Sequence, residues 1–418
     1  MTGTAVSATL GLAYSVYAQN LLGNRLAGEF VTALAFVSAG QLAFGPLNGA
    51  VARLVALYYG SDNPERIGAL ADRYRVRLLF LIGVLTIPLL GVSSWAASAF
   101  RFSDWKIPAL AVVAVAASLL LSVERGILRG MMHFAYLSFN NVFESAVRLV
   151  GGIAFLHVYA RPISGVAGYL AGALAAWVWA RGLLSRPLSE CRAVEAVESG
   201  DAGATEPSAG AADSHRLFLI PLLATMLVSA GFQNIDMIAA KFYLPAVAAG
   251  TYGASFTLGK LMSALVTPFT TLLLPALAAL HGAGRETGRT FARVTGLFGI
   301  VSVLPLALLA IWPELVIDRL FDPSFSDGAE FVLFVAIARW LGFGCHFVAL
   351  AGAASGKFYF LGAYMPLLGV QWVLLTFRHD SCYDIAFMTV LGHVVAFVIM
   401  ACFLPGLLRS PSAKTGAA

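Results

Sequence analysis

The sequence predicts an all-α polytopic membrane protein, and three observations support this prediction. Of its 418 residues, 59% are hydrophobic and only 12% are charged, which is about half the charged share of an ordinary soluble domain. So few charges cannot cover the surface of a water-soluble protein of this size. The apolar residues form long unbroken runs, such as 78–97 and 107–123, rather than the alternating segments of a membrane β-barrel. In lipid, helices are the remaining way to satisfy every backbone hydrogen bond.

Twelve segments are long and apolar enough to cross a bilayer, for which about 20 residues suffice. They are residues 4–22, 29–59, 77–98, 107–128, 134–158, 162–184, 216–242, 247–280, 290–313, 329–353, 358–377 and 383–408. The second and eighth segments exceed the thickness of a bilayer. We therefore expect each of these two to tilt, protrude into water or bend at its proline.

Lysine and arginine residues set the expected orientation, because they concentrate in the cytoplasmic loops of membrane proteins. Of the 27 basic residues, 16 lie at the termini or in or beside loops after even-numbered segments, with Arg125 among them, and 7 lie in or beside loops after odd-numbered segments. This bias predicts that both termini are cytoplasmic. We expect the acidic loop 314–330 on the opposite side of the membrane.

Residues 185–214 interrupt the series of apolar segments. They are rich in Ala, Gly, Ser and Glu without apolar periodicity, which predicts a flexible cytoplasmic linker. The linker separates an N-terminal six-helix lobe, 1–184, from a C-terminal six-helix lobe with a short cytoplasmic tail, 215–418. A shift of 222 residues aligns Gly28 with Gly250 and Pro46 with Pro268. Since each half has an even number of segments, we predict a parallel repeat, which suits alternating access.

Charged residues inside the predicted segments are the candidate functional residues, because a charge at the bilayer centre costs at least ~2.5 kcal/mol. Each must face a partner or a water-filled cavity. The principal members are Lys260, Arg339, Arg53, Arg148, Glu144 and Asp236. Four cations against two carboxylates predict a cationic cavity that suits an anionic group such as pyrophosphate. The two carboxylates are the candidates for ion coupling.

Each of these residues also has a structural interpretation. Glu144 and Arg148 are four residues apart on one helix, so they could pair with each other. Arg53 lies near a cytoplasmic helix end and could extend its guanidinium to the membrane surface. Asp236 could pair with a neighbouring lysine, either Lys241 or Lys260.

The sequence contains no catalytic or metal-binding pattern that we recognise. It lacks the Gly-x-x-x-x-Gly-Lys-[Ser/Thr] phosphate loop, so we expect neither ATP hydrolysis nor a cofactor. Its four cysteines lack the spacing of a metal site or a disulfide framework. His346 and His393 lie in apolar segments, and we interpret them as hydrogen-bonded packing residues.

Four stretches resemble one family of membrane proteins. They are Asn20-Leu-Leu-Gly-Asn-Arg-Leu-Ala-Gly-Glu-Phe30, Gly126-Ile-Leu-Arg-Gly-Met-Met-His-Phe134, Asn234-Ile-Asp236 and Ala249-Gly-Thr-Tyr252. The chain is similar here to lipid-linked oligosaccharide flippases of the polysaccharide-export (Wzx-like) family, within the multidrug/oligosaccharidyl-lipid/polysaccharide exporter superfamily. The resemblance implies a two-lobed exporter of the bacterial inner membrane that carries a polyprenyl-pyrophosphate-linked oligosaccharide outward. The implied partners are membrane lipids and the polymerase or glycosyltransferases of the same pathway, without nucleic acid.

Other functions remain as alternatives. The first is an ion-coupled small-molecule antiporter of the same superfamily, in which Asp236 or Glu144 would be essential and the basic residues would not. A membrane-embedded glycosyltransferase or polymerase would need acidic catalytic residues or a large outer loop, and the outer loops expected here are short. A scaffold without transport activity leaves the buried cations unexplained.

Overall fold

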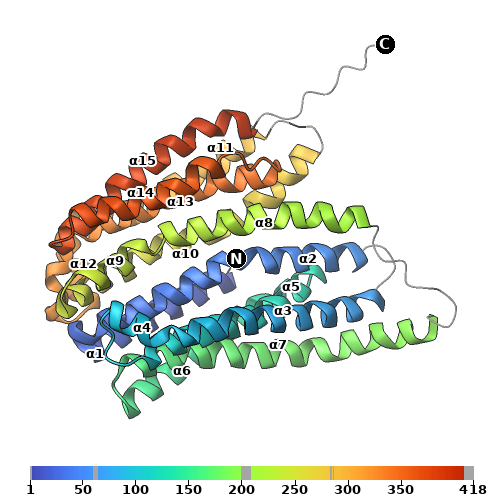
Figure 1. The fold of residues 1–418 in the computed structure, drawn as a ribbon, viewed down its shortest axis with the longest axis horizontal. Coiled ribbons are helices and arrows are strands. Elements are labelled where there is room, and N and C mark those ends of the chain that lie inside the picture. Colours follow the sequence, from blue (N-terminus) through green and yellow to red (C-terminus); the bar gives the residue numbers. More distant parts are fainter. Residues whose placement is uncertain (1, 60–64, 199–208, 283–284, 286, 409–418) are drawn as a thin grey trace. The chain divides into compact units, whose positions relative to one another are not determined.

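The structure is a computed structural model that describes residues 2–59, 65–198, 209–282, 285 and 287–408. Every regular element in these ranges is a helix (Figure 1), which confirms the predicted all-α class. Many apolar side chains lie on outer faces: Phe80 and Ile87 of α3 (Glu65–Gly91) are 74% and 72% exposed. Faces of this kind require lipid as their solvent. The chain is therefore a polytopic membrane protein.

The number of membrane crossings is close to the predicted twelve. Eight helices in the described part of the chain are long and apolar enough to cross a membrane, and the bent pair α8–α9 makes a ninth. The number of crossings reaches twelve if the run Gly3–Ala56 is counted as two and if α10 (Ala246–Gly282) and the shorter α14 (Leu361–Phe377) are added.

The chain divides into two compact units. Unit 1 comprises Met1–Leu22 and Ala33–Met226, and unit 2 comprises Gly23–Thr32 and Leu227–Ala418. Helix α1 (Thr2–Ala43) contributes to both units and is kinked at Gly23, where φ is 67°. Glycine adopts this left-handed conformation at no steric cost. The lobe boundaries at 184 and 215 stay a prediction.

Several helices extend beyond the apolar segments that predicted them. Helix α3 begins at Glu65, well before residue 77. Helices α7 (Pro162–Glu198) and α8 (Ala209–Phe232) continue into the range predicted as a linker, of which 199–208 lie outside the described residues. The acidic loop 314–330 contains α12 (Pro313–Leu320) and the 3-10 helix η1 (Pro323–Glu330). Leu, Arg, Glu and Ala are good helix formers, so a helix continues where its apolar run ends.

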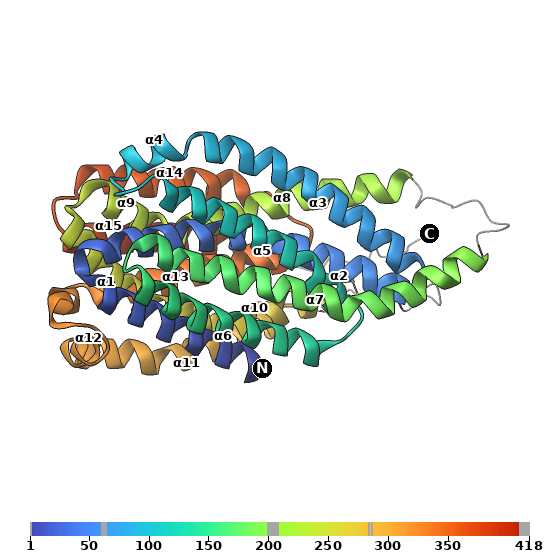
Figure 2. The ribbon, with the colours of Figure 1, turned by 90° about the horizontal axis from the view of Figure 1, so that it is seen from below.

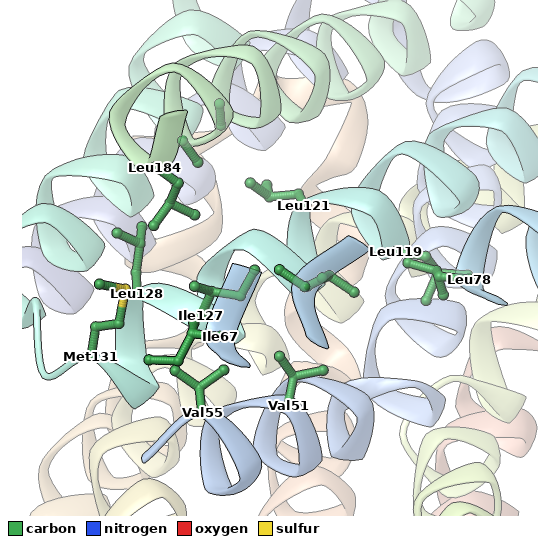
Figure 3. Close-up of a cluster of buried hydrophobic side chains, with 14 residues drawn as sticks. Val51, Val55, Ile67, Leu78, Leu119, Leu121, Ile127, Leu128, Met131 and Leu184 are labelled. Atoms are coloured by element: carbon green, nitrogen blue, oxygen red, sulfur yellow. The ribbon is translucent and has the colours of Figure 1, made fainter. Parts of the chain in front are cut away.

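Unit 1 is built around α5 (Lys106–Gly130). Helices α2 (Gly45–Tyr59), α3 and α7 pack against α5, and α6 (Phe134–Val158) packs against α7 (Figure 2). The short helix α4 (Ser93–Ala99) follows α3. A buried apolar cluster joins α2, α3, α5 and α7 through residues that include Val55, Ile67, Leu121 and Leu184 (Figure 3).

Two further features tie α5 to its neighbours. A Cβ atom on Gly130 would lie 2.7 Å from the carbonyl oxygen of Ala52, so glycine allows the backbones of α5 and α2 to approach closely, as small residues do in membrane helices. Arg75 of α3 donates from Nε and Nη2 to the two carboxylate oxygens of Glu124 at 2.9 and 2.6 Å. This bidentate ion pair joins α3 to α5.

Unit 2 is centred on α13 (Val332–Ala354). Helices α10, α11 (Gly288–Ile311) and α15 (Cys382–Leu408) pack against α13, and α14 packs against α15 (Figure 1). The rings of Phe232 and Tyr364 stack at 5.4 Å within a buried apolar cluster of this unit.

A break in one membrane-crossing segment creates the polar centre of unit 2. Helix α8 ends at Phe232, and α9 (Ile235–Tyr243) continues after a bend of 47°. The break leaves backbone carbonyls without helical partners, and His393 Nε2 lies 3.2 Å from the carbonyl oxygen of Phe232. Asp236 lies in the first turn of α9, where the helix dipole favours a carboxylate.

The segment Gly23–Thr32 of α1 packs within unit 2 against the start of α10. A Cβ atom on Gly28 would lie 2.9 Å from the amide nitrogen of Gly250, and one on Gly250 would lie 1.6 Å from the carbonyl oxygen of Asn24. Only glycine fits at this crossing. The repeat alignment pairs these same two glycines.

We predict that Gly250→Ala destabilises the protein. Overpacking against a fixed backbone costs about 1–3 kcal/mol, which exceeds the roughly 1 kcal/mol gained from the helix propensity of alanine. The thermal unfolding midpoint of the purified protein should therefore fall by several degrees. Gly299→Ala in α11 is the matched control, because its Cβ meets open space. Equal midpoints for the two variants would contradict the close contact.

Candidate functional site

Unit 1 contains a polar cavity of about 390 Å³ that residues of α1, α2, α5 and α6 line. Most of its lining side chains are polar: Ser7, Gln41, Asn48, Ser118, Ser122, Arg125, Asn141, Glu144, Ser145 and Arg148. A hydrophilic cavity among membrane helices is a site for water or for a polar ligand.

A carboxylate between two arginines forms the charged part of this cavity. Glu144 Oε2 accepts from Arg125 Nη2 at 2.7 Å, and Glu144 Oε1 accepts from Arg148 Nη2. The side chains of Glu144, Arg125 and Arg148 are only 9%, 17% and 14% exposed. Two guanidinium groups on one carboxylate leave the cluster with one net positive charge.

The cluster is held by three helices. Asn140, Glu144 and Arg148 recur every four residues of α6 and so share one face of that helix. Asn140 accepts from Arg125 Nε of α5 at 2.7 Å and donates to the carbonyl oxygen of Ala176 in α7 at 2.9 Å. The guanidinium carbon of Arg148 lies 4.0 Å from the ring centre of Tyr169 in α7, a cation–π distance. Rigid elements therefore fix the position of both arginines.

Neutral polar groups also line the cavity. Gln41 Nε2 donates to Ser118 Oγ at 2.8 Å, and both residues line the cavity together with the charged cluster. Two buried atoms, Asn48 Oδ1 and Arg148 Nε, have no hydrogen-bond partner within the described part of the chain. Buried polar atoms usually find a partner. Asn48 Oδ1 and Arg148 Nε are exceptions to this rule, although both of their residues line the cavity.

Unit 2 has a polar centre of a different kind. Arg339 Nη2 of α13 donates to Asp236 Oδ1 and Oδ2 at 2.6 and 2.8 Å, and Tyr252 donates to Oδ2 at 3.1 Å. Asp236 and Arg339 are 1% and 2% exposed. The ring of Phe256 lies 4.3 Å from the guanidinium carbon of Arg339 and 4.8 Å from Lys260 Nζ. The Asp236–Arg339 pair is neutral and closed off by packing.

The structure brings some of the predicted site residues together and separates others. Glu144 and Arg148 meet in the cavity of unit 1, and their pairing, which the spacing of four residues suggested, is confirmed. Arg53 is exposed on α2 and is not among the residues that line this cavity. Its assignment to substrate binding stays a prediction.

The remaining predicted residues lie in unit 2. Asp236 pairs with Arg339, a partner that differs from the two neighbouring lysines suggested by the sequence. Lys260 is partly buried beside Phe256. The roles of Lys260 and Arg339 in substrate binding, and of Asp236 in ion coupling, stay predictions.

The two histidines behave as the sequence predicts. His346 Nδ1 lies 3.3 Å from Ser229 Oγ, and His393 Nδ1 lies 2.8 Å from the carbonyl oxygen of Thr389. Both histidines are buried. They are hydrogen-bonded packing residues of unit 2.

Sequence reasoning missed Arg125 and Tyr252 as members of these two polar centres. Arg125 falls inside the predicted segment 107–128, which could have identified it as an intramembrane charge, but it was counted with the cytoplasmic loop. Tyr252 belongs to one of the stretches that carry the family resemblance, but nothing in the sequence indicated that it contacts a buried carboxylate. An apolar segment gives no signal of which aromatic side chain faces a buried carboxylate.

Comparisons with known proteins give structural matches only. No protein-family model and no curated protein sequence matches the chain. The structure is similar to the inward-facing form of a multidrug resistance MATE family transporter of the MOP superfamily, with a TM-score of 0.68, 15% identity, and coverage of 98% of this chain and 96% of that one. It is also similar to the lipid II flippase MurJ in an inward closed form, with a TM-score of 0.68, 13% identity, and coverage of 97% and 87%.

A eukaryotic MATE transporter, AtDTX14, matches with a TM-score of 0.59, 14% identity, and coverage of 96% of this chain and 92% of that one. At such low identities the shared property is the fold. The chain has the fold of the MATE and MurJ transporters over nearly its whole length.

We predict that Asp236→Asn strongly destabilises the protein, because it leaves the buried guanidinium of Arg339 without its counter-charge. Breaking a buried ion pair costs about 3–5 kcal/mol. Asp236→Asn combined with Arg339→Gln should recover a large part of this loss, and thermal unfolding of the four-member mutant cycle measures the coupling. Asp318→Asn, at an exposed position of α12, is the control. Additive losses in the double variant would show that the pair is not coupled.

Proposed function

We propose that this chain is a flippase of a bacterial inner membrane. Its cargo is a polyprenyl-pyrophosphate-linked oligosaccharide, such as a repeat unit of O-antigen, exopolysaccharide or capsule, which it carries to the periplasmic face by alternating access. The fold supports a transporter, because solved structures of the same fold are named transporters and one is named a lipid II flippase. It acts as a transporter rather than an enzyme.

The polar cavity of unit 1 carries this proposal. Its charged residues are Arg125, Arg148 and Glu144, so its net charge is positive. Its remaining polar residues bear hydroxyl and amide groups, which hydrogen-bond sugar hydroxyls. A net positive charge beside neutral hydrogen-bonding groups is complementary to an anionic glycolipid head group.

Other cations complete the proposed pathway. Arg53 and Lys260 lie outside the cavity of unit 1 and are candidates to bind the pyrophosphate. Arg339 is a further candidate, and it is paired with Asp236 in this structure. The termini and the linker lie on the cytoplasmic side in this proposal, as the distribution of basic residues predicts. The polymerase and glycosyltransferases of the same pathway are its functional partners.

The alternative is an ion-coupled antiporter of small molecules, which the similarity to multidrug resistance transporters favours. The buried carboxylates of this chain meet the requirements of such an antiporter less well. A cation needs an uncompensated carboxylate, whereas Glu144 already binds two arginines and Asp236 binds one. We therefore prefer the anionic cargo.

We predict that cells lacking this chain accumulate lipid-linked oligosaccharide on the cytoplasmic face of the membrane and lose surface glycan. Re-expression of the wild type should restore export. Arg148→Gln should restore it at least about tenfold less well, because hydrogen bonds from charged groups contribute about 1.5–3 kcal/mol. Glu144 stays paired with Arg125 in this variant. Protease-accessible or chemically labelled glycan at each face measures the distribution.

Arg161→Gln is the matched control, since Arg161 is exposed and does not line the cavity. It should restore export fully. Normal surface glycan in the deletion strain would refute the flippase. Proton- or sodium-driven efflux of a small cation from proteoliposomes, lost in Glu144→Gln, would establish the antiporter instead.

A further inference from the structure

We propose that each unit binds an anionic phospholipid of the surrounding membrane on the outer face of one helix, α3 in unit 1 and α11 in unit 2. On each helix two arginines hold the lipid phosphate, and a stripe of apolar side chains contacts the acyl chains. The inference goes beyond the proposed function and does not depend on the cargo.

Helices α3 and α11 are the most lipid-exposed spans. Of the eight single helices that can cross a membrane in the described part of the chain, these two are the least buried. Helix α3 packs against α5 and α7, and α11 packs against α10 and α13. Both helices also carry a long row of exposed apolar side chains, and a row of this kind needs lipid as its solvent.

One exposed stripe on α3 combines charge with apolar surface. Its members recur every three or four residues and therefore share one face of the helix: Arg73, Arg77, Phe80, Val84 and Ile87. All five side chains are exposed. The two arginines make no ion pair within the described ranges, whereas Arg75, between them in sequence, pairs with Glu124 and Asp72. The stripe thus presents two cations without a protein counter-charge.

Helix α11 repeats this stripe. Its members follow the same three- and four-residue spacing and are all exposed: Arg289, Arg293, Leu297, Ile300, Leu304, Leu308 and Ile311. A shift of 216 residues aligns the two arginine pairs, Arg73 with Arg289 and Arg77 with Arg293. The two helices correspond to the third predicted segment of each half. The same arrangement therefore occurs twice, at equivalent places in the repeat.

The helices themselves do not account for these arginines. Residues 73–91 and 288–311 contain no acidic residue, so neither stripe has a counter-charge on its own helix. Arg289 lies in the first turn of α11, where the helix dipole disfavours a cation. Two guanidinium groups one turn apart can both donate to one phosphate group. An external phosphate therefore supplies the missing partner.

The length of each stripe agrees with a bilayer. An exposed tryptophan lies near the far end of each stripe, Trp95 in α4 and Trp312 directly after α11. Trp95 is 18 residues from Arg77, and Trp312 is 19 residues from Arg293. At 1.5 Å per residue these separations are about 27–29 Å, close to the ~30 Å of the hydrocarbon core. Tryptophan prefers one interface, so the arginines lie at the head groups of the other, which is the predicted cytoplasmic side and attracts anionic lipids.

Native mass spectrometry of the purified full-length protein tests the two lipid sites. The probes are phosphatidylglycerol, which is anionic, and phosphatidylcholine, which is zwitterionic, with identical acyl chains. We expect two phosphatidylglycerol molecules to stay bound, at concentrations at least about tenfold lower than phosphatidylcholine needs, because two arginines attract each anionic head group. Phosphatidylglycerol should also raise the thermal unfolding midpoint in detergent, since a ligand of the folded state stabilises it.

Two double variants locate the sites. Arg73→Gln with Arg77→Gln should lose one bound lipid, and Arg289→Gln with Arg293→Gln should lose the other. All four arginines are exposed, so both variants should fold, which size-exclusion chromatography checks. Arg161→Gln is the matched control, because Arg161 is exposed and lies in a loop predicted on the opposite side of the membrane. It should keep both lipids.

Three results would overturn the proposal. Equal binding of the two phospholipids would show that charge does not select the lipid. Two phosphatidylglycerol molecules still bound after loss of all four arginines would place the lipids elsewhere. Displacement of phosphatidylglycerol by a polyprenyl pyrophosphate at a lower concentration would assign the stripes to that lipid instead.

Discussion

A charge buried among membrane helices must be neutralised, and this constraint joins particular pairs of helices. Taking a carboxylate out of water costs several kcal/mol, which a well-placed arginine offsets. Glu124, Glu144 and Asp236 are buried, and each accepts hydrogen bonds from arginine. Their ion pairs join α3 to α5, α5 to α6, and α9 to α13. Apolar side chains choose partners weakly in lipid, so these pairs add specific links to the apolar packing.

The helical class and most membrane-crossing segments follow from the sequence because lipid requires long apolar helices. The ends of the helices do not. Helix α3 begins at Glu65 and α7 continues to Glu198, since polar helix formers prolong a helix without adding to its apolar run. The kink at Gly23 could not be predicted from the sequence either. Glycine is frequent throughout this chain, and the sequence does not show which glycine of α1 adopts a positive φ.

The candidate site was predictable only where its contacts are local. Glu144 and Arg148 are four residues apart, so helical geometry places them together. Arg125 reaches Glu144 from another helix, and Arg339 lies 103 residues from Asp236, so no local period relates either pair. In the distribution of loop charges, Arg125 indicates only the orientation of the chain. A basic residue near a helix end can orient the chain or neutralise a neighbour, and three-dimensional placement is needed to distinguish the two.

The same pairing rule explains why the polar centres of the two units differ. In unit 2, Asp236 meets one arginine, and Tyr252 and Phe256 complete its packing. A neutral, enclosed pair of this kind stabilises the bent α8–α9 segment against α13 but offers little to a ligand. In unit 1, Glu144 meets two arginines beside an open polar cavity. An uncompensated charge in such a place is stabilised only by water or by an anion. The proposal of an anionic cargo therefore depends on the cavity of unit 1 and not on the polar centre of unit 2.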